Sequence, residues 1–204
     1  MPRSSFASAR LPTTAHTTRP WRIHDVVRDF HLEDVWALPT PGGAGDFPRL
    51  VHDLPPMLAG AGRQSRVVGA LFGIRWAIGR LLGWDRPGAG LDLRVPSLRE
   101  RLSPELRDAP SDPVLPQFTS LYLLDDEWAA EIANRTVHGV IHVGWVPDER
   151  GRYRGEMAVY AKPNGRLGKI YMAAITPFRR LLVYPAMLRH VERAWEEMSR
   201  GEAR

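Results

Sequence analysis

Residues 128–162 read WAAEIANRTVHGVIHVGWVPDERGRYRGEMAVYAK and contain the strongest indication of the architecture of this chain. This stretch holds three runs of strand-like alternation, at 128–134, 137–146 and 153–162, and a fourth run precedes them at 118–124. Turn-forming residues separate the runs, and Pro147–Gly151 suits a hairpin loop. Because strands with short connections pair with their neighbours in sequence, we expect a four-stranded antiparallel meander.

The last three runs place different chemistry on the two faces of this sheet. Residues two apart in a strand share a face. One face is apolar and collects Trp128, Ala130, Ile132, Val137, Gly139, Ile141, Val143, Trp145, Tyr153, Gly155, Met157 and Val159. The opposite face is charged and collects Glu127, Glu131, Arg135, His138, His142, Arg154, Glu156 and Lys162. This pattern is typical of a sheet with one face on the core and the other in water.

The apolar face needs a cover, and residues 167–198 offer one. Apolar residues recur there at helical spacings of three, four or seven: Ile170, Ala174, Leu181, Tyr184, Leu188, Val191 and Trp195. Pro177 and Pro185 fall inside the segment, so we expect a kink or a break, since proline removes a backbone donor and clashes with the preceding turn. The predicted fold class is α+β, an antiparallel sheet wrapped around a long C-terminal helix.

Shorter elements are expected in the first quarter of the chain. The apolar residues of 21–27 predict an edge strand, and the Pro and Gly residues of 39–45 predict a loop. Asp46 is placed to cap a helix that runs to Leu54 and ends at Pro55 and Pro56. Residues 1–19, which lack acidic residues, indicate a flexible leader, and residues 20–199 a single domain.

A strongly apolar helix is expected at residues 65–84. Arg75 and Arg80 interrupt it, which favours a mostly buried helix over a membrane span, with a membrane-interface helix as an alternative. Residues 88–116 are rich in Pro, Asp and Arg and predict an irregular connector with one short helix near 104–107.

Composition limits the classes of function. The 204 residues include no cysteine, which excludes disulfides, a thiolate nucleophile and cysteine-based metal sites, and favours a cytoplasmic protein. The net charge of +5 comes from arginines spread along the chain and not gathered in one stripe, so we expect no nucleic-acid partner. Peripheral membrane contact is a minor alternative.

Three stretches carry a resemblance to a known family: Trp21–His24, Glu33–Gly43 and Lys162–Tyr171, the last continuing through Pro177-Phe178-Arg179. On these motifs the chain resembles the bacterial family called domain of unknown function 2867, over about residues 20–198. That family resembles the START/Bet v 1 (SRPBCC) helix-grip superfamily, in which a curved sheet and a C-terminal helix enclose an apolar cavity. The resemblance carries over no catalytic residues, and the apolar helix at 65–84 departs from a minimal helix-grip domain.

The predicted site lies between sheet and C-terminal helix. Its candidate ligand-binding residues are Trp128, Trp145, Tyr153, Met157, Tyr171 and Tyr184, with core packing as the competing interpretation. His138 and His142 lie four apart on one strand, roughly 13 Å, too far for one metal ion to bridge directly. We interpret them as members of a solvated face with cross-strand ion pairs, with a metal or acid–base site as the alternative.

These observations favour a binding module for an apolar small molecule or lipid, with no cofactor and no metal. Nucleophile elbows, zinc-binding helices and phosphate-cradling loops are absent from the sequence. The alternatives are a pocket-shaped enzyme of cyclase, hydratase or isomerase type, and a module that contacts a protein or a membrane surface.

Overall fold

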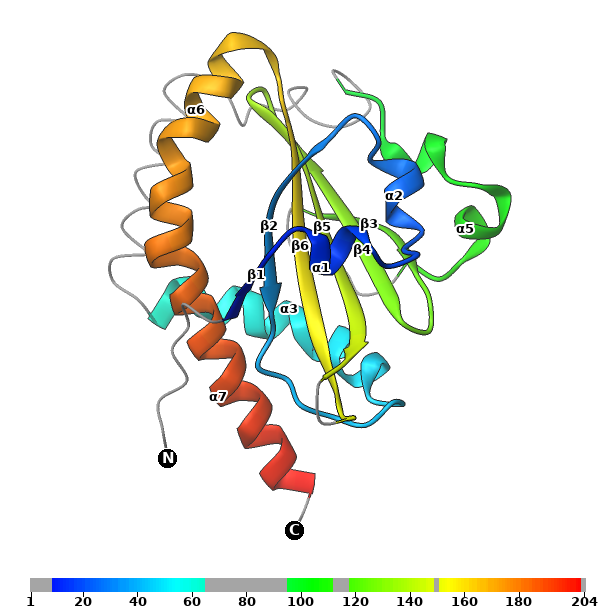
Figure 1. The fold of residues 1–204 in the computed structure, drawn as a ribbon, viewed down its shortest axis with the longest axis vertical. Helices are drawn as coiled ribbons and strands as arrows, with labels where there is room; N and C mark the ends of the chain where they lie inside the picture. Colours follow the sequence, from blue (N-terminus) through cyan, green and yellow to red (C-terminus); the bar gives the residue numbers. More distant parts are fainter. Residues whose placement is uncertain (1–8, 65–94, 112–117, 149–150, 203–204) are drawn as a thin grey trace.

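In the computed structural model, which describes residues 9–64, 95–111, 118–148 and 151–202, six strands form one antiparallel sheet in the order β1-β2-β6-β5-β4-β3 (Figure 1). The strands are β1 (Arg10–Leu11), β2 (His31–Ala37), β3 (Thr119–Leu123), β4 (Glu127–Ala133), β5 (Val137–Pro147) and β6 (Tyr153–Pro163). The predicted meander is confirmed as β3 to β6. β2 pairs with the outer edge of β6 and extends the sheet beyond the meander.

The register confirms which residues share a face. Trp128 on β4 lies opposite Val143 on β5, which lies opposite Met157 on β6. Their strand neighbours form the alternate row, in which His142 lies opposite both Ala129 and Ala158. The two predicted sets of side chains therefore do point to opposite faces.

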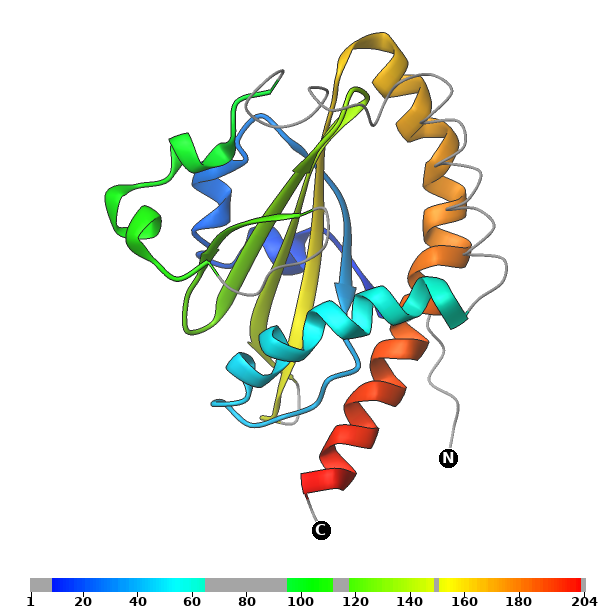
Figure 2. The same cartoon turned by 180° about the vertical axis from the view of Figure 1, so that it is seen from behind.

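Two helices cover the apolar face, and Figure 2 shows α3 (Phe47–Gln64) crossing in front of the sheet with α7 (Tyr184–Glu202) beside it. Their buried side chains form one core with the sheet: Trp36, Leu38, Phe47, Leu50, Val51, Leu54, Met57, Trp128, Ala130, Val143, Trp145, Met157, Tyr184, Met187, Leu188, Val191 and Trp195. The expectation that α3 ends at Leu54 is wrong, because the helix continues through Pro55 and Pro56. Burial of Leu54 and Met57 on both sides of the proline pair offsets the missing backbone hydrogen bonds.

The C-terminal helix is interrupted as expected, but only its second half covers the sheet. A π-helical turn, η3 (Arg179–Val183), joins α6 (Gly165–Phe178) to α7. The extra residue of a π turn rotates the following helix by about 100° relative to the preceding one. Leu188 is therefore fully buried, whereas Ile170 and Leu181 are 67% and 73% exposed, so their predicted place in the interface is wrong.

The opposite face is also covered, which corrects the prediction of a solvated sheet. α2 (Ile23–Val26), the 3-10 helix η2 (Leu98–Arg101) and α5 (Pro104–Asp108) contribute apolar residues to a second core, and α1 (Thr14–Thr17) contributes the buried His16. Its buried members are Trp21, Ile23, Val26, Val27, Val35, Leu98, Leu102, Leu106, Leu121, Tyr122, Ala129, Val140, Val146, Ala158 and Tyr160. Glu127, Glu131, His138, His142 and Glu156 lie beneath this cover, each at most 3% exposed.

Outside the meander, the chain agrees with some of the expected elements and differs from others. The edge strand expected at 21–27 is wrong, because Ile23–Val26 is helical and its apolar residues pack on the sheet. Ordered structure begins before residue 20, since β1 pairs with β2 and His16 on α1 is fully buried. The loop at 39–45 and the short helix near 104–107 are confirmed.

The apolar helix expected at 65–84 lies outside the described residues. Among the helices that the structure does describe, none combines the length and apolar character needed to cross a membrane.

Candidate functional site

The structure brings four of the six predicted site residues into one packed core. Trp128, Trp145, Met157 and Tyr184 are buried together against α3 and α7, whereas Tyr153 is half-buried beside Trp145. Trp128 Nε1 donates to Ser120 Oγ at 2.9 Å, and Trp145 Nε1 donates to the Gly43 carbonyl at 3.0 Å.

The sixth residue, Tyr171, is half-buried on α6, away from this core. Side chains of α3 such as Phe47 and Leu50 occupy the space between the sheet and α7.

An open groove, here called the edge groove, lies where the β1–β2 edge of the sheet meets the C-terminal helix. Its volume is about 580 Å³, and it is lined by Arg10, Trp36, Thr176, Pro177, Arg180, Leu181 and Pro185. The π turn shapes one wall, because the rotation between α6 and α7 turns Leu181 away from the core. Trp36 is only 3% exposed, and its Nε1–H has no hydrogen-bond acceptor. The groove thus has largely apolar walls, which include Trp36, Pro177 and Leu181.

Arginines outnumber carboxylates at the rim of the edge groove. The side chain of Asp34 is fully buried and accepts hydrogen bonds from Arg180 Nε at 2.7 Å and Arg179 Nη2 at 3.0 Å. Arg179 Nη2 also donates to Glu33, and Arg10 lies 3.4 Å from Asp34 with 46% of its side chain exposed. Three guanidinium groups therefore share two carboxylates.

A β-bulge explains how two consecutive acidic residues reach the same arginine. The pairing of β2 with β6 shifts register between Leu32 and Asp34, which inserts Glu33 as an extra residue. Bulges re-aim side chains in this way. Sequence reasoning missed the site, although Glu33-Asp34 and Arg179-Arg180 both stand in the stretches that carried the family resemblance or directly after them.

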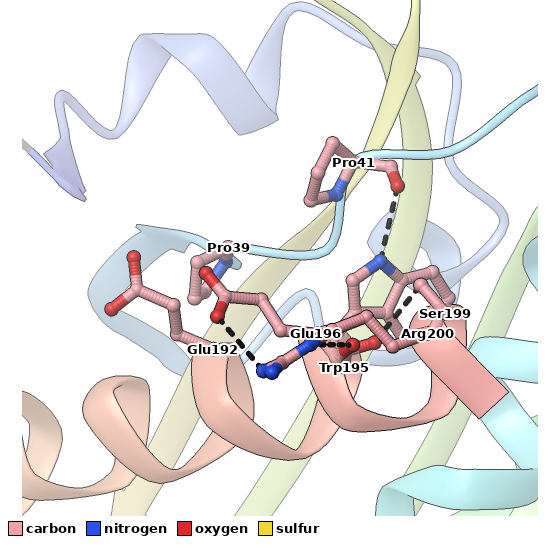
Figure 3. Close-up of a pocket in the computed structure, with 7 residues that line it drawn as sticks. All are labelled: Pro39, Pro41, Glu192, Trp195, Glu196, Ser199 and Arg200. Atoms are coloured by element: carbon pink, nitrogen blue, oxygen red, sulfur yellow. Dashed lines mark hydrogen bonds and ion pairs between the residues drawn. The ribbon is translucent and has the colours of Figure 1, made fainter. Parts of the chain in front are cut away.

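A second hollow, of about 450 Å³, lies between the 39–45 loop and the last turns of α7 (Figure 3). Trp195 Nε1 donates to the Pro41 carbonyl at 3.0 Å and fastens the loop to the helix. Glu196 and Arg200 pair with each other across one helical turn. Because these polar groups are paired among themselves, fewer of them remain to bind a ligand in this hollow than in the edge groove.

The histidines that were predicted to face water form buried pairs with carboxylates. His138 Nε2 lies 2.7 Å from Glu131, and His142 Nε2 lies 2.8 Å from Glu127. The pairs are cross-strand contacts as expected, but their predicted exposure is wrong. Within the described ranges, no group of three or more histidine, aspartate or glutamate side chains is arranged to hold a metal ion.

Fold and site together define an α+β domain whose six-stranded antiparallel sheet packs against a long C-terminal helix, with a basic, apolar groove along one edge. The chain belongs to the family described as "Protein of unknown function (DUF2867)", whose sequence model matches residues 26–186. No curated protein and no solved structure matches the chain.

Proposed function

We propose that this chain is a ligand-binding domain of the START/Bet v 1 helix-grip type that holds an amphiphilic small molecule or lipid in the edge groove. The observation that carries the proposal is the pairing of apolar walls, Trp36 and Leu181, with arginines that exceed the nearby carboxylates. Ligand sites are typically apolar clefts with a few polar groups that fix orientation.

The charge at the rim indicates the head group. Arg10 is half-exposed and is 3.4 Å from a carboxylate that two other arginines already contact, so its guanidinium has donors left for a ligand. Carboxylate and phosphate oxygens match guanidinium geometry. An acyl chain beside Leu181 and an anionic head group at Arg10 would use both parts of the groove.

The edge groove does not coincide with the cavity that was expected between the sheet and the C-terminal helix. The edge groove lies along the outside of the same interface and is lined by residues of β1, β2 and the C-terminal helix. Its access to solvent allows a ligand to enter without unpacking the core.

Calorimetric titration of the purified protein with three dodecyl compounds tests this proposal. Dodecanoate is expected to bind more tightly than dodecanol, and dodecanol more tightly than dodecyltrimethylammonium, because only the first has an anionic head group. Leu181→Asp is expected to weaken dodecanoate binding at least tenfold.

Leu167→Asp is the matched control, since Leu167 is an exposed leucine on α6 that does not line the groove. Arg10→Gln should remove the preference for the anion, whereas Arg166→Gln should keep it. Equal binding by the Leu181 and Leu167 variants, or no preference among the head groups, would overturn the proposal.

A further inference from the structure

The large apolar side chains that remain exposed gather on one segment of the protein. In the part of the chain that the structure describes, all of them lie on α6 and the π turn that follows it: Leu167, Ile170, Phe178, Leu181 and Leu182. Their exposed fractions run from 37% to 73%. Single apolar residues scattered over a surface are ordinary, whereas apolar residues gathered in one patch mark a surface that contacts a partner or a membrane.

Most of these side chains form a line along α6, here called the α6 stripe. It follows spacings of three and four residues, which place its members on one side of the helix: Leu167, Ile170, Ala174, Phe178 and Leu181. The buried residues of α6, Gly168 and Met172, lie on the other side. The stripe therefore faces away from the sheet.

Contacts at both ends hold α6 in this orientation beside the β2 edge of the sheet (Figure 1). At its start, the Asn164 amide donates to the Thr136 carbonyl at 2.8 Å, and Gly168 packs so closely on the same carbonyl that no side chain would fit there. Directly after its end, Arg179 and Arg180 pair with carboxylates of β2. The exposure of the α6 stripe is thus fixed by the fold.

The charge around the α6 stripe is positive. Residues 157–191 contain six basic residues and no acidic one, whereas the rest of the chain contains 22 basic and 23 acidic residues. Basic residues are spread along the whole sequence, but the unbalanced ones are not. Arg166 and Lys169 are exposed on α6 beside the stripe, and neither pairs with a carboxylate within the described ranges. The three guanidinium groups that share two carboxylates at the rim of the edge groove add a further unbalanced charge.

We propose that the α6 stripe binds the surface of a lipid bilayer that contains anionic lipids. Ile170 and Phe178 enter the boundary between head groups and acyl chains, and Arg166 and Lys169 contact lipid phosphates. A helix with an apolar side and flanking basic residues lies in the plane of a membrane in this way.

Other occupants match the α6 stripe less well. A second copy of the chain would bring basic residues opposite basic residues, which opposes association. Nucleic acid would pair with the basic residues but leave the apolar side chains in water. An anionic bilayer satisfies both parts of the surface.

The α6 stripe meets the edge groove at its C-terminal end. Leu181 belongs to both, and Pro177 and Arg180 line the groove. A protein bound through the stripe therefore holds the groove next to the lipid surface, where an amphiphilic ligand would partition. Membrane contact does not require an occupied groove, so each of the two proposals can fail without the other.

Flotation of the full chain with lipid vesicles tests membrane binding. Binding to mixed vesicles of phosphatidylcholine and phosphatidylserine is expected to be at least about tenfold tighter than binding to phosphatidylcholine alone. It should weaken in about 0.5 M salt, which screens the contacts of exposed basic residues. Failure of the protein to float with the anionic vesicles would overturn the proposal.

Ile170→Gln combined with Phe178→Gln removes apolar surface and keeps the charge. Both side chains are at least half exposed, so the variant is expected to fold, and its vesicle binding should weaken at least about tenfold. Neither residue lines the edge groove, so the variant should still bind dodecanoate, which separates this test from that of the proposed function. Undiminished vesicle binding would place the membrane contact elsewhere on the chain.

Sedimentation velocity of the wild type and of this apolar double variant examines the second-copy alternative. Both are expected to sediment alike. A wild-type dimer that the variant loses, together with no vesicle binding, would assign the α6 stripe to a second copy and refute membrane contact.

Arg166→Gln combined with Lys169→Gln removes charge and keeps the apolar surface. Vesicle binding should again weaken at least about tenfold. The matched control is Arg107→Gln combined with Arg193→Gln, which removes two exposed arginines from α5 and α7 and should change binding by less than about threefold. Equal losses in the two variants would show that only the net charge of the protein matters.

A spin label locates the contact, since the chain has no cysteine of its own. On vesicle-bound protein, a nitroxide on Ile170→Cys is expected to be shielded from a water-soluble relaxation agent. A nitroxide on Thr119→Cys, an exposed position on β3 at the other edge of the sheet, is expected to stay accessible. An accessible label at position 170 on bound protein would contradict the proposed orientation.

Discussion

The two faces of the sheet are both buried, yet they are built from different chemistry. The face under α3 and α7 is almost wholly apolar, so its burial follows from removing that surface from water. The face under α1, α2, η2 and α5 mixes apolar residues with histidine–carboxylate pairs. Charged residues on a strand therefore indicate exposure to solvent only when they lack partners on the neighbouring strands.

The largest expected effect is on the apolar face. Trp128→Ala removes a fully buried indole that also donates to Ser120, and should lower the free energy of unfolding by about 4 kcal/mol. Urea denaturation followed by circular dichroism measures the loss. A loss below about 1 kcal/mol would show that the apolar core is looser than the structure indicates.

The polar face should make the protein sensitive to acid. The His142 pKa falls from 6.5 in the unfolded chain to about 4 in the folded one, so between these values the unfolded state binds a proton that the folded state does not. Stability therefore falls as the pH drops through this window, by about 3 kcal/mol in total. Urea denaturation at several pH values measures the slope, and His142→Gln should flatten it. An unchanged slope in that variant would assign the acid sensitivity to other groups.

A glycine on β5 allows the polar face to close. A Cβ at Gly144 would lie 2.6 Å and 2.8 Å from ring atoms of Trp21, so Gly144→Ala must displace the indole and should cost about 2 kcal/mol. Gly45→Ala is the control, since nothing lies within 4 Å of its added Cβ. Thermal denaturation of both variants compares the two sites, and equal Tm values would show that Trp21 is not held against the strand.

The smallest effect should be on α6. Ile170→Lys changes a residue that is 67% exposed, so the free energy of unfolding should change by less than about 0.5 kcal/mol. Leu188→Ala on α7 is the contrast, with an expected loss of at least about 2 kcal/mol. A large loss of unfolding free energy in Ile170→Lys would instead favour the single apolar stripe that was predicted from the sequence.

The features that depend on local periodicity were predicted correctly from the sequence. The meander and the assignment of residues to faces follow from a period of two, and both are confirmed. The period of the C-terminal helix also predicted Tyr184, Leu188, Val191 and Trp195 as core, but the π turn cannot be read from spacing. The π turn adds one residue to the helical repeat between the two prolines. Residues before the π turn therefore face a different direction from residues after it.

The prediction that the polar face is exposed was wrong because the charged residues on that face were given more weight than the apolar residues between them. Val140, Val146, Ala158 and Tyr160 alternate with the charged positions on that face and were the available signal of burial. Part of the cover comes from Ile23 and Val26 on α2, whose four residues are too few for a periodic pattern. The edge groove depends on a β-bulge and on side chains from three distant segments, which spacing along the chain does not bring together.

The titration of His142 shows whether the polar face of the sheet is interior. Nuclear magnetic resonance of the folded protein across acidic pH should show the His142 ring neutral at pH 6 and gaining its proton only near pH 4, where burial has placed its pKa. Titration of that ring near its ordinary pKa of 6.5, with the protein still folded, would contradict the account.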